Sequence, residues 1–185
     1  MKEKWNERFG AEGYFYGTEP NDFLVEQAMK IKVGGKVLCL AEGEGRNAIF
    51  LAGLGFDVTA VDFSSEGLKK LSQLAKKKNV NVATALADLG QFDMGVDKWD
   101  AIISIWCHLE EPLRAIVTAN AKRALKKGGL FILESYTPDQ LKYKTGGPSD
   151  PSMLLTEAKL AKEFAGFKFL INKEKVREIS EGIAH

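Results

Sequence analysis

The chain has 185 residues, and its 26 Lys and Arg nearly balance its 25 Asp and Glu, which leaves a formal net charge of +1. This length suits one domain with a substantial hydrophobic core. The balanced charge lacks the basic excess of nucleic-acid-binding proteins, so we expect no nucleic-acid partner. The charged start, Met1 to Trp5, is unlike a signal peptide, and no apolar stretch has membrane-spanning length. We therefore expect a cytoplasmic protein without a membrane partner.

Short apolar runs alternate with helical patterns along the chain. Strands are predicted at residues 37–40, 56–61, 81–86, 100–105, 130–134 and 167–179. Helices are predicted at residues 1–9, 22–30, from 46, 64–78, from 112 and 156–164. The alternation is typical of an α/β protein with a doubly wound, mainly parallel sheet. Residues 1–185 form a single domain in this interpretation, with an N-terminal helical and aromatic cap at 1–30 and a candidate lid at 137–155.

Several residues suggest where these helices begin and end. Asp22 is a suitable N-cap for the helix at 22–30, and Ser64 or Ser65 for the helix at 64–78. Pro112 can open a helix, because the N–H that it lacks would have no partner there. The Lys-Lys-Gly-Gly sequence at 126–129 is predicted to close that helix with cations and a left-handed glycine.

A glycine-bearing turn follows the first predicted strand. Gly43-x-Gly45-x-x-Ala48 matches the dinucleotide-binding fingerprint, and Asp62 lies about twenty residues further on, where a ribose-binding acid belongs. Glycines at this turn let the backbone approach a ligand closely. Taken alone, this pattern is weak evidence and also fits a nicotinamide-dependent dehydrogenase.

The charges on this turn favour a different cofactor. Glu42 and Glu44 flank Gly43, where a dinucleotide would place its pyrophosphate. Like charges about 4 Å apart repel by roughly 1 kcal/mol in bulk water and about 4 kcal/mol at an effective dielectric constant of 20. S-adenosylmethionine instead brings a sulfonium and an ammonium group, which acids attract. The alternative is that both glutamates face solvent.

Two aspartates at successive strand ends support the same choice. Asp62 can accept hydrogen bonds from both ribose hydroxyls, because an ionised carboxylate has only acceptors. Asp88 follows the third predicted strand, where it can accept from an adenine amino group. Either aspartate alone is more often a turn or cap residue, but the pair after a glycine turn is more specific.

The sequence resembles the class I S-adenosylmethionine-dependent methyltransferases, and within them the small tellurite-resistance-like methyltransferases. The resemblance rests on five segments, at residues 16–24, 42–48, 58–62, 107–109 and 146–148. It implies a Rossmann-like methyltransferase sheet with strand order 3-2-1-4-5-7-6. It also implies cofactor contacts from Glu42, Gly43, Gly45, Asp62, Asp88, Ile105 and Cys107.

The sequence departs from this family pattern in two ways. Cys39 stands where an acid is usual, and Ala41 where a glycine is usual. The chain also ends at His185, so we expect the seventh strand to be absent. An unpaired sheet edge would then favour dimerisation, and we expect either a monomer or a dimer through that edge.

The acceptor site is predicted near the end of the fourth strand. His108 is a candidate general base or substrate-orienting group, and the alternative is a helix-entry histidine bonded to backbone. Trp106, Tyr16 and Arg46 are candidate substrate contacts, and the alternatives are that the Tyr16 ring serves packing and that Arg46 pairs with Glu42 or Glu44. Cys39 and Cys107 lack histidines at metal-binding spacing, so no metal is expected.

These observations predict methyl transfer from S-adenosylmethionine to a small-molecule acceptor by in-line displacement. The resemblance suggests a thiol or chalcogen compound. No Asp/Asn-Pro-Pro-aromatic motif follows the fourth strand, which argues against amino-group methylation of nucleic acid or protein. The alternatives are an NAD(P)-dependent oxidoreductase and a non-catalytic S-adenosylmethionine-binding protein.

Overall fold

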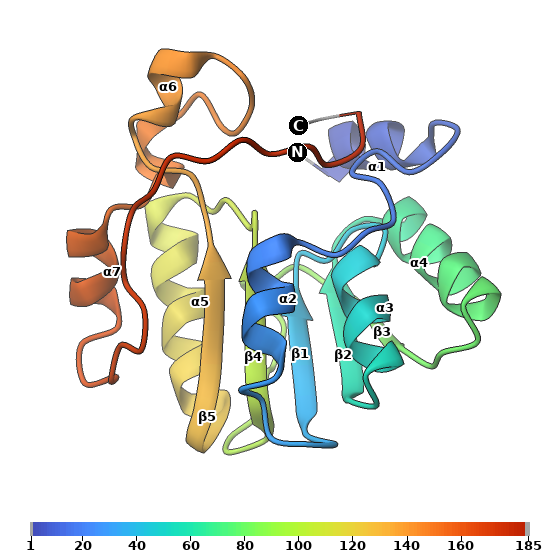
Figure 1. The fold of residues 1–185 in the computed structure, drawn as a ribbon, viewed down its shortest axis with the longest axis horizontal. Coiled ribbons are helices and arrows are strands. Elements are labelled where there is room, and N and C mark those ends of the chain that lie inside the picture. Colours follow the sequence, from blue (N-terminus) through green and yellow to red (C-terminus); the bar gives the residue numbers. More distant parts are fainter. Residues whose placement is uncertain (1, 184–185) are drawn as a thin grey trace.

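A computed structural model describes residues 2–183 of the chain, and its centre is a five-stranded parallel sheet (Figure 1). The strands are β1 (Lys36–Leu40), β2 (Asp57–Asp62), β3 (Ala83–Leu86), β4 (Trp99–Ile105) and β5 (Leu125–Glu134). Their order in space is β3-β2-β1-β4-β5, and every neighbouring pair is parallel. The predicted fold class and the order of the first five strands are therefore confirmed.

Seven α-helices and one short 3-10 helix lie around the sheet within residues 2–183. They are α1 (Lys2–Gly10), α2 (Asp22–Ala28), α3 (Arg46–Gly53), α4 (Ser65–Lys77), α5 (Glu111–Ala124), α6 (Gln140–Tyr143), η1 (Pro151–Met153) and α7 (Glu157–Glu163). The core of one sheet face includes side chains from α2, α3 and α4, and the core of the other includes side chains from α5. This is the doubly wound arrangement expected from the alternating pattern.

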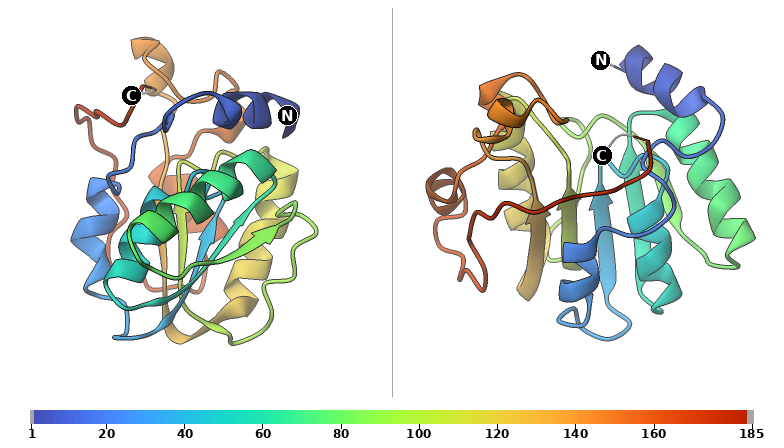
Figure 2. Two further views of the ribbon diagram at one scale, coloured as in Figure 1. Left: turned by 90° about the vertical axis from the view of Figure 1, so that its right-hand side faces the viewer. Right: turned by 45° about the horizontal axis from the view of Figure 1, so that its top comes forward.

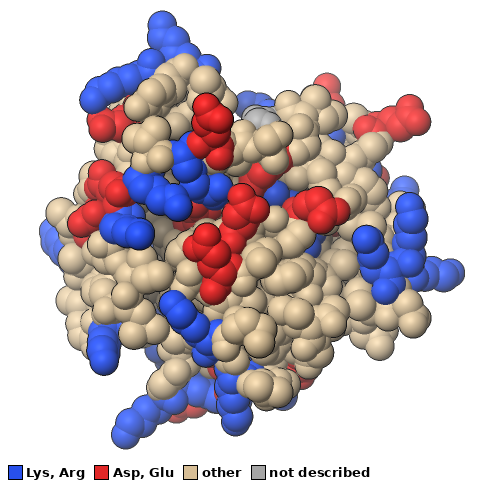
Figure 3. Space-filling view, viewed as in Figure 1, with Lys and Arg blue, Asp and Glu red and all other residues tan. Residues whose placement is uncertain are grey.

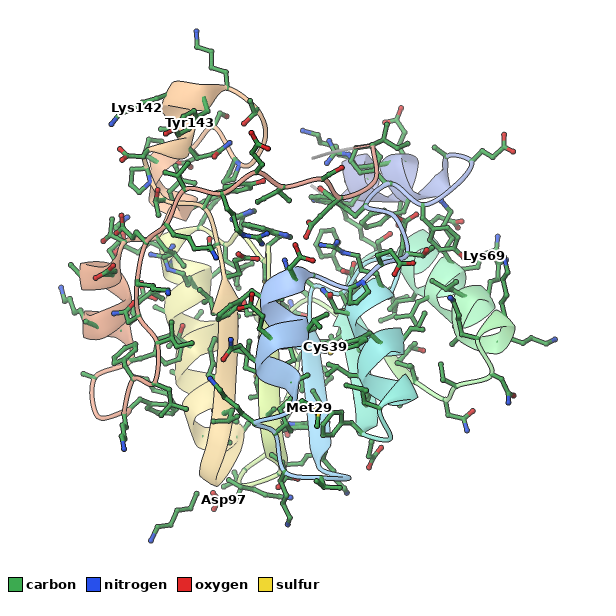
Figure 4. The ribbon with its side chains drawn as sticks, viewed as in Figure 1. Met29, Cys39, Lys69, Asp97, Lys142 and Tyr143 are labelled. Carbon is green, nitrogen blue, oxygen red and sulfur yellow. The ribbon has the colours of Figure 1, made fainter. Side chains whose placement is uncertain are left out.

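Side-chain alternation along β1 explains the two cores. Val37 and Cys39 belong to the core on the α2–α3 side, whereas Leu38 and Leu40 belong to the core on the α5 side. All four are at most 2% exposed, as expected of a central parallel strand that is covered on both faces. Figure 4 shows Cys39 on this central strand. Its thiol is buried in the core and forms no disulfide.

Two of the predicted helix ends are wrong. Helix α2 is capped by Asn21, whose side chain accepts from the backbone N–H of Leu24, and not by Asp22. Helix α5 ends at Ala124, and residues 126–129 belong to β5 rather than to a glycine cap. Lys126 instead pairs with Asp100 at 2.7 Å, where it compensates a carboxylate on the neighbouring strand. Ser64 does cap α4, through the N–H of Gly67.

The sixth predicted strand, at residues 167–179, is also wrong. In the described part of the chain this segment contains no helix or strand. It continues across the carboxyl ends of the strands and reaches the segment after α1 (Figures 1 and 2). The backbone N–H of Ile183 donates to Phe15 at 2.9 Å and fixes its far end. We call residues 167–183 the strap.

The carboxyl ends of the strands therefore lie beneath three coverings. Helix α1 stands over the β2 side and the segment with α6 and η1 over the β5 side, with the strap running between them (Figure 1). The predicted lid at 137–155 thus contains two short helices, and it is fixed near its ends by Leu155, which donates to Tyr136, and by Arg114, which donates to Ser152. Lys142 and Tyr143 of α6 lie at its outer end (Figure 4).

The outer surface mixes both signs of charge. Figure 3 shows Lys and Arg interspersed with Asp and Glu on the face viewed in Figure 1. This mixture agrees with the balanced composition. No helix within residues 2–183 is long and apolar enough to cross a membrane.

Candidate functional site

The turn after β1 is built from positive-φ residues. Ala41 has φ 49°, Gly43 has φ 59° and Gly45 has φ 92°. A side chain at Gly43 would lie 2.9 Å from the Phe9 ring, and one at Gly45 would lie 2.3 Å from Leu71. The two predicted glycines are thus required by both backbone conformation and space. Ala41 adopts the left-handed conformation that explains why a glycine is usual there.

Asp62 ends β2 directly beside this turn. Its Oδ2 accepts from the N–H of Gly43 at 2.8 Å, and its Oδ1 accepts from the N–H of Ser64 at 2.7 Å. The residue is 4% exposed, and burial raises the pKa of its carboxyl despite these hydrogen bonds. The backbone N–H of Phe63 also contributes a hydrogen bond, so of about four acceptor positions at least one remains for a ligand hydroxyl.

Glu42 places a second carboxylate on the same turn. Its Oε1 accepts from the N–H of Ala48 at 2.7 Å, in the first turn of α3. Burial raises the pKa of this carboxyl from 4.5 to about 7, and the negative charge of Asp62 contributes to the rise. Neither Glu42 nor Asp62 forms an ion pair with the residues that the structure describes. A cation near Gly43 would compensate the negative charges of both carboxylates.

Glu44 faces a different part of the molecule from Glu42. Its carboxylate pairs with Lys70 of α4 at 2.9 Å and accepts from the N–H of Phe15 at 2.7 Å. The side chain is 4% exposed, so it does not face solvent as the alternative supposed. Glu44 therefore ties the segment after α1 to α4, and the electrostatic argument rests on Glu42 and Asp62.

The remaining predicted cofactor residues lie at the ends of β3 and β4. Asp88 follows β3, is exposed, and accepts from the N–H of Gly90 at 2.7 Å. Ile105 ends β4 and is 7% exposed. Burial raises the pKa of the Cys107 thiol to about 12, so this group stays protonated at neutral pH and is not a nucleophile.

An aromatic cluster follows β4 and β5. The Trp106 and Tyr136 rings stack with centroids 4.5 Å apart, and the His108 ring lies 5.5 Å from that of Tyr136. The Nδ1 atom of His108 lies 3.3 Å from the hydroxyl of Ser135. Trp106 has φ 55°, a strained conformation that occurs often at binding sites. We call Trp106, His108 and Tyr136 the aromatic wall.

Arg46 and Tyr16 lie near this wall, and Arg46 contacts Glu181, which the sequence did not suggest as a site residue. Arg46 pairs with Glu181 of the strap at 2.7 Å, rather than with Glu42 or Glu44. Tyr16 accepts from Arg8 at 3.5 Å, and burial raises the pKa of its hydroxyl. Glu181 is 135 positions from Arg46, and no local pattern marks it as a site residue.

The structure thus brings the candidates together at one end of the sheet. Glu42, Gly43, Gly45 and Asp62 surround the turn after β1, and the aromatic wall lies beyond β4 and β5. Asp88 lies apart, after the outer strand β3. Among residues 2–183, no group of three His, Cys, Asp or Glu side chains could hold a metal ion.

Comparison with solved structures identifies the class of fold. The crystal structure of TehB from Haemophilus influenzae aligns with 96% of this chain and 59% of its own, at a TM-score of 0.72 and 24% identity. A second solved structure aligns with 90% of this chain and 79% of its own, at a TM-score of 0.75 and 20% identity. Its description is the conversion of a disulfide bond into a thioacetal group during echinomycin biosynthesis. The fold is the Rossmann-like fold of S-adenosylmethionine-dependent methyltransferases.

Sequence comparison gives the family. The family described as tellurite resistance protein TehB matches residues 10–181, and the chain belongs to this family. A probable S-adenosyl-L-methionine-dependent methyltransferase TehB from Haemophilus influenzae is 29% identical over 174 residues, which are 91% of this chain and 59% of that protein. A glycine/sarcosine N-methyltransferase from Aphanothece halophytica is 31% identical over 73% of this chain and 49% of its own length. The chain thus spans about half to three fifths of these relatives, and the family implies S-adenosylmethionine as the cofactor.

Proposed function

We propose that this chain binds S-adenosylmethionine at the turn after β1 and transfers its methyl group to a small-molecule acceptor, a thiol or chalcogen compound. The observation that carries this proposal is the pair of carboxylates around Gly43, the half-buried Glu42 and the buried Asp62. Glu42 and Asp62 both have raised pKa values and no ion-pair partner among the described residues. A sulfonium or ammonium group would compensate them, whereas a pyrophosphate would be repelled.

The cofactor, when bound, supplies a methyl carbon that is activated by the adjacent sulfonium. Asp62 would accept from the ribose hydroxyls with the acceptor capacity that its backbone hydrogen bonds leave. Asp88, exposed beside Gly90, would accept from the adenine amino group. Gly43 and Gly45 would let the backbone lie close to the ligand, with Ile105 and Cys107 packed beside it.

The aromatic wall is the proposed acceptor side of the site. His108 would take the proton of a thiol or chalcogenol acceptor, and its Nδ1 contact with Ser135 would hold the ring in position. Trp106 and Tyr136 would exclude water from the acceptor and align it with the methyl group. Among the relatives, one is named for glycine and sarcosine and another for demethylmenaquinone, so the named acceptors differ widely.

Titration calorimetry with S-adenosylhomocysteine tests the cofactor half of this proposal. Asp62→Ala should weaken binding by about 1–3 kcal/mol, the loss typical of charge-assisted hydrogen bonds. The matched control is Asp57→Ala, at the exposed amino end of the same strand, which should bind as the wild type does. Equal affinity in both variants would remove Asp62 from the site.

Turnover assays with thiols, selenols, amines and oxyanions test the acceptor half. Methylation of a thiol or selenol but not of amines is the expected result. Stabilisation by NADH and not by S-adenosylhomocysteine would favour the oxidoreductase alternative. Cofactor binding without turnover of any acceptor would favour a non-catalytic binding protein.

The oligomeric state can be tested in the same preparations. The outer strands of the sheet are β3 and β5. We propose a monomer or a dimer through one of these edges, because an unpaired edge exposes backbone donors and acceptors. Light scattering during size-exclusion chromatography distinguishes the two, and a higher assembly would contradict both.

A further inference from the structure

Three side-chain donors from separate parts of the fold converge on the strap. Asn21 Nδ2 donates to Glu181 Oε1 at 3.1 Å, and Arg46 Nη2 and Trp106 Nε1 donate to Glu181 Oε2 at 2.7 and 2.9 Å. The donors belong to the N-cap of α2, the start of α3 and the residue after β4. One carboxylate thus receives three N–H groups, one of them from a guanidinium. We call Asn21, Arg46 and Trp106 the donor trio.

The donor trio is held in place by the folded core. Asn21 is fully buried, and its backbone N–H donates to the side chain of Asn47 at 2.9 Å. Arg46 is 8% exposed and also donates to the carbonyl of Glu19 at 3.4 Å. Trp106 stacks on Tyr136 in the aromatic wall. These donors would therefore keep their arrangement if the carboxylate between them left.

The carboxylate itself comes from a segment with no regular structure. Residues 167–181 contain no helix or strand, and Glu181 is held by its contacts with the trio together with the backbone bond from Ile183 to Phe15. Burial alone would disfavour its charge, yet the hydrogen bonds from Arg46, Asn21 and Trp106 lower the pKa of Glu181 below its ordinary value. The trio therefore stabilises a carboxylate in its ionised form.

Of the trio, Arg46 borders a small cavity. A cavity of about 150 Å³ lies between the strap and the segment at 16–22, and it is lined by Arg46 and Glu181. The nearest other acid is Glu134, which accepts from Asn21 at 2.6 Å. Glu134 is paired with Arg177 of the strap at 2.8 Å, so its charge is compensated. The Arg46 guanidinium pairs with Glu181 and would become available to another anion if Glu181 left.

We propose that Asn21, Arg46 and Trp106 form a binding site for a small-molecule carboxylate, which Glu181 of the strap occupies in this structure. The ligand displaces Glu181 and takes its three hydrogen bonds, including the charge-assisted bond from the guanidinium. Because Trp106 is also part of the aromatic wall, a bound carboxylate lies beside His108. The inference that this carboxylate belongs to the methyl acceptor rests on the proposed function, whereas the site itself does not.

Acetate is a suitable probe, because it matches the end of the glutamate side chain. In Glu181→Ala the trio loses its internal ligand, and 100 mM acetate should raise the melting temperature above its value in 100 mM chloride by about 3 °C. Wild-type protein, whose trio is filled, should respond at least threefold less. The double variant Glu181→Ala with Arg46→Met is the control and should show no acetate effect. An equal response in all three proteins, or no response in Glu181→Ala, would overturn the proposal.

A second measurement uses the wild-type chain and covers the case in which Glu181→Ala does not fold. Lys175 and Arg177 lie in the strap, so trypsin cleavage there reports its release. Acetate that displaces Glu181 should accelerate this cleavage at least twofold over chloride at the same ionic strength, with an unrelated substrate as the control for trypsin itself. Unchanged cleavage would count against displacement. Neither experiment uses S-adenosylmethionine, so failure here is distinct from failure of the proposed methyl transfer.

Discussion

Glu42 should make the stability of the protein fall as the pH rises, and Glu42→Gln should remove this loss. Burial raises the pKa of this carboxyl from 4.5 to about 7. Between these pH values the folded protein keeps a proton that the unfolded chain has lost, so the free energy of unfolding decreases as pH increases. At about 1.36 kcal/mol per pKa unit, the loss reaches at most about 3 kcal/mol above pH 7. Because the Glu42 side chain is partly exposed to water, the loss of stability is smaller than this limit.

Urea unfolding at pH 4.5 and pH 8 measures this effect. A glutamine at position 42 keeps an acceptor oxygen for the N–H of Ala48 and carries no charge. The stability of Glu42→Gln relative to wild type should therefore increase by about 1–3 kcal/mol from pH 4.5 to pH 8. Glu44→Gln is the matched control, and it should gain nothing at pH 8 because it loses the ion pair with Lys70. If the difference between Glu42→Gln and wild type were the same at both pH values, the electrostatic reasoning would be refuted.

Four further substitutions test the turn and the aromatic wall. Gly45→Ala should lower the free energy of unfolding in urea by about 2–4 kcal/mol, because the new methyl group meets Leu71 at 2.3 Å, and a loss below about 0.5 kcal/mol would contradict this. Ala41→Gly should stabilise the protein by about 0.5 kcal/mol in the same assay, because glycine adopts a left-handed φ of 49° without strain. This gain outweighs the added conformational freedom of the unfolded chain, and clear destabilisation would contradict it. His108→Ala should lower kcat about 100-fold and leave S-adenosylhomocysteine affinity unchanged, and Ser135→Ala should have a smaller effect. Equal turnover in His108→Ala and wild type would exclude a general base at this position.

The sequence predicted the features that depend on neighbouring residues. Ser64 caps its helix as the local signal indicated, and the glycine turn takes its form from Gly43 and Gly45. The order of the first five strands came from the family resemblance. These elements are determined by short stretches of chain, so a pattern within each stretch is enough to predict them.

Contacts between distant segments could not be predicted in this way. Residues 167–179 have the apolar run of a strand, but a strand also needs a partner edge, and this segment crosses the strand ends instead. Glu181 meets Arg46 across 135 positions, and its charge alone suggested only a surface residue. Glu44 had the same signal as Glu42, and only the position of Lys70 distinguishes the two.

The two halves of the site are covered by different segments, which bears on how ligands enter. Phe9 of α1 is 4% exposed and packs on Gly43, and Asn6 of the same helix accepts from the hydroxyl of Ser64, beside Asp62. Helix α1 therefore covers the carboxylates proposed to bind the cofactor. The strap covers the donor trio through a charged contact that an anion can replace, whereas α1 is held partly by an aromatic contact that an anion cannot. If the cofactor binds at the proposed carboxylates, its entry requires α1 to move, and release of the strap would open the proposed acceptor half alone.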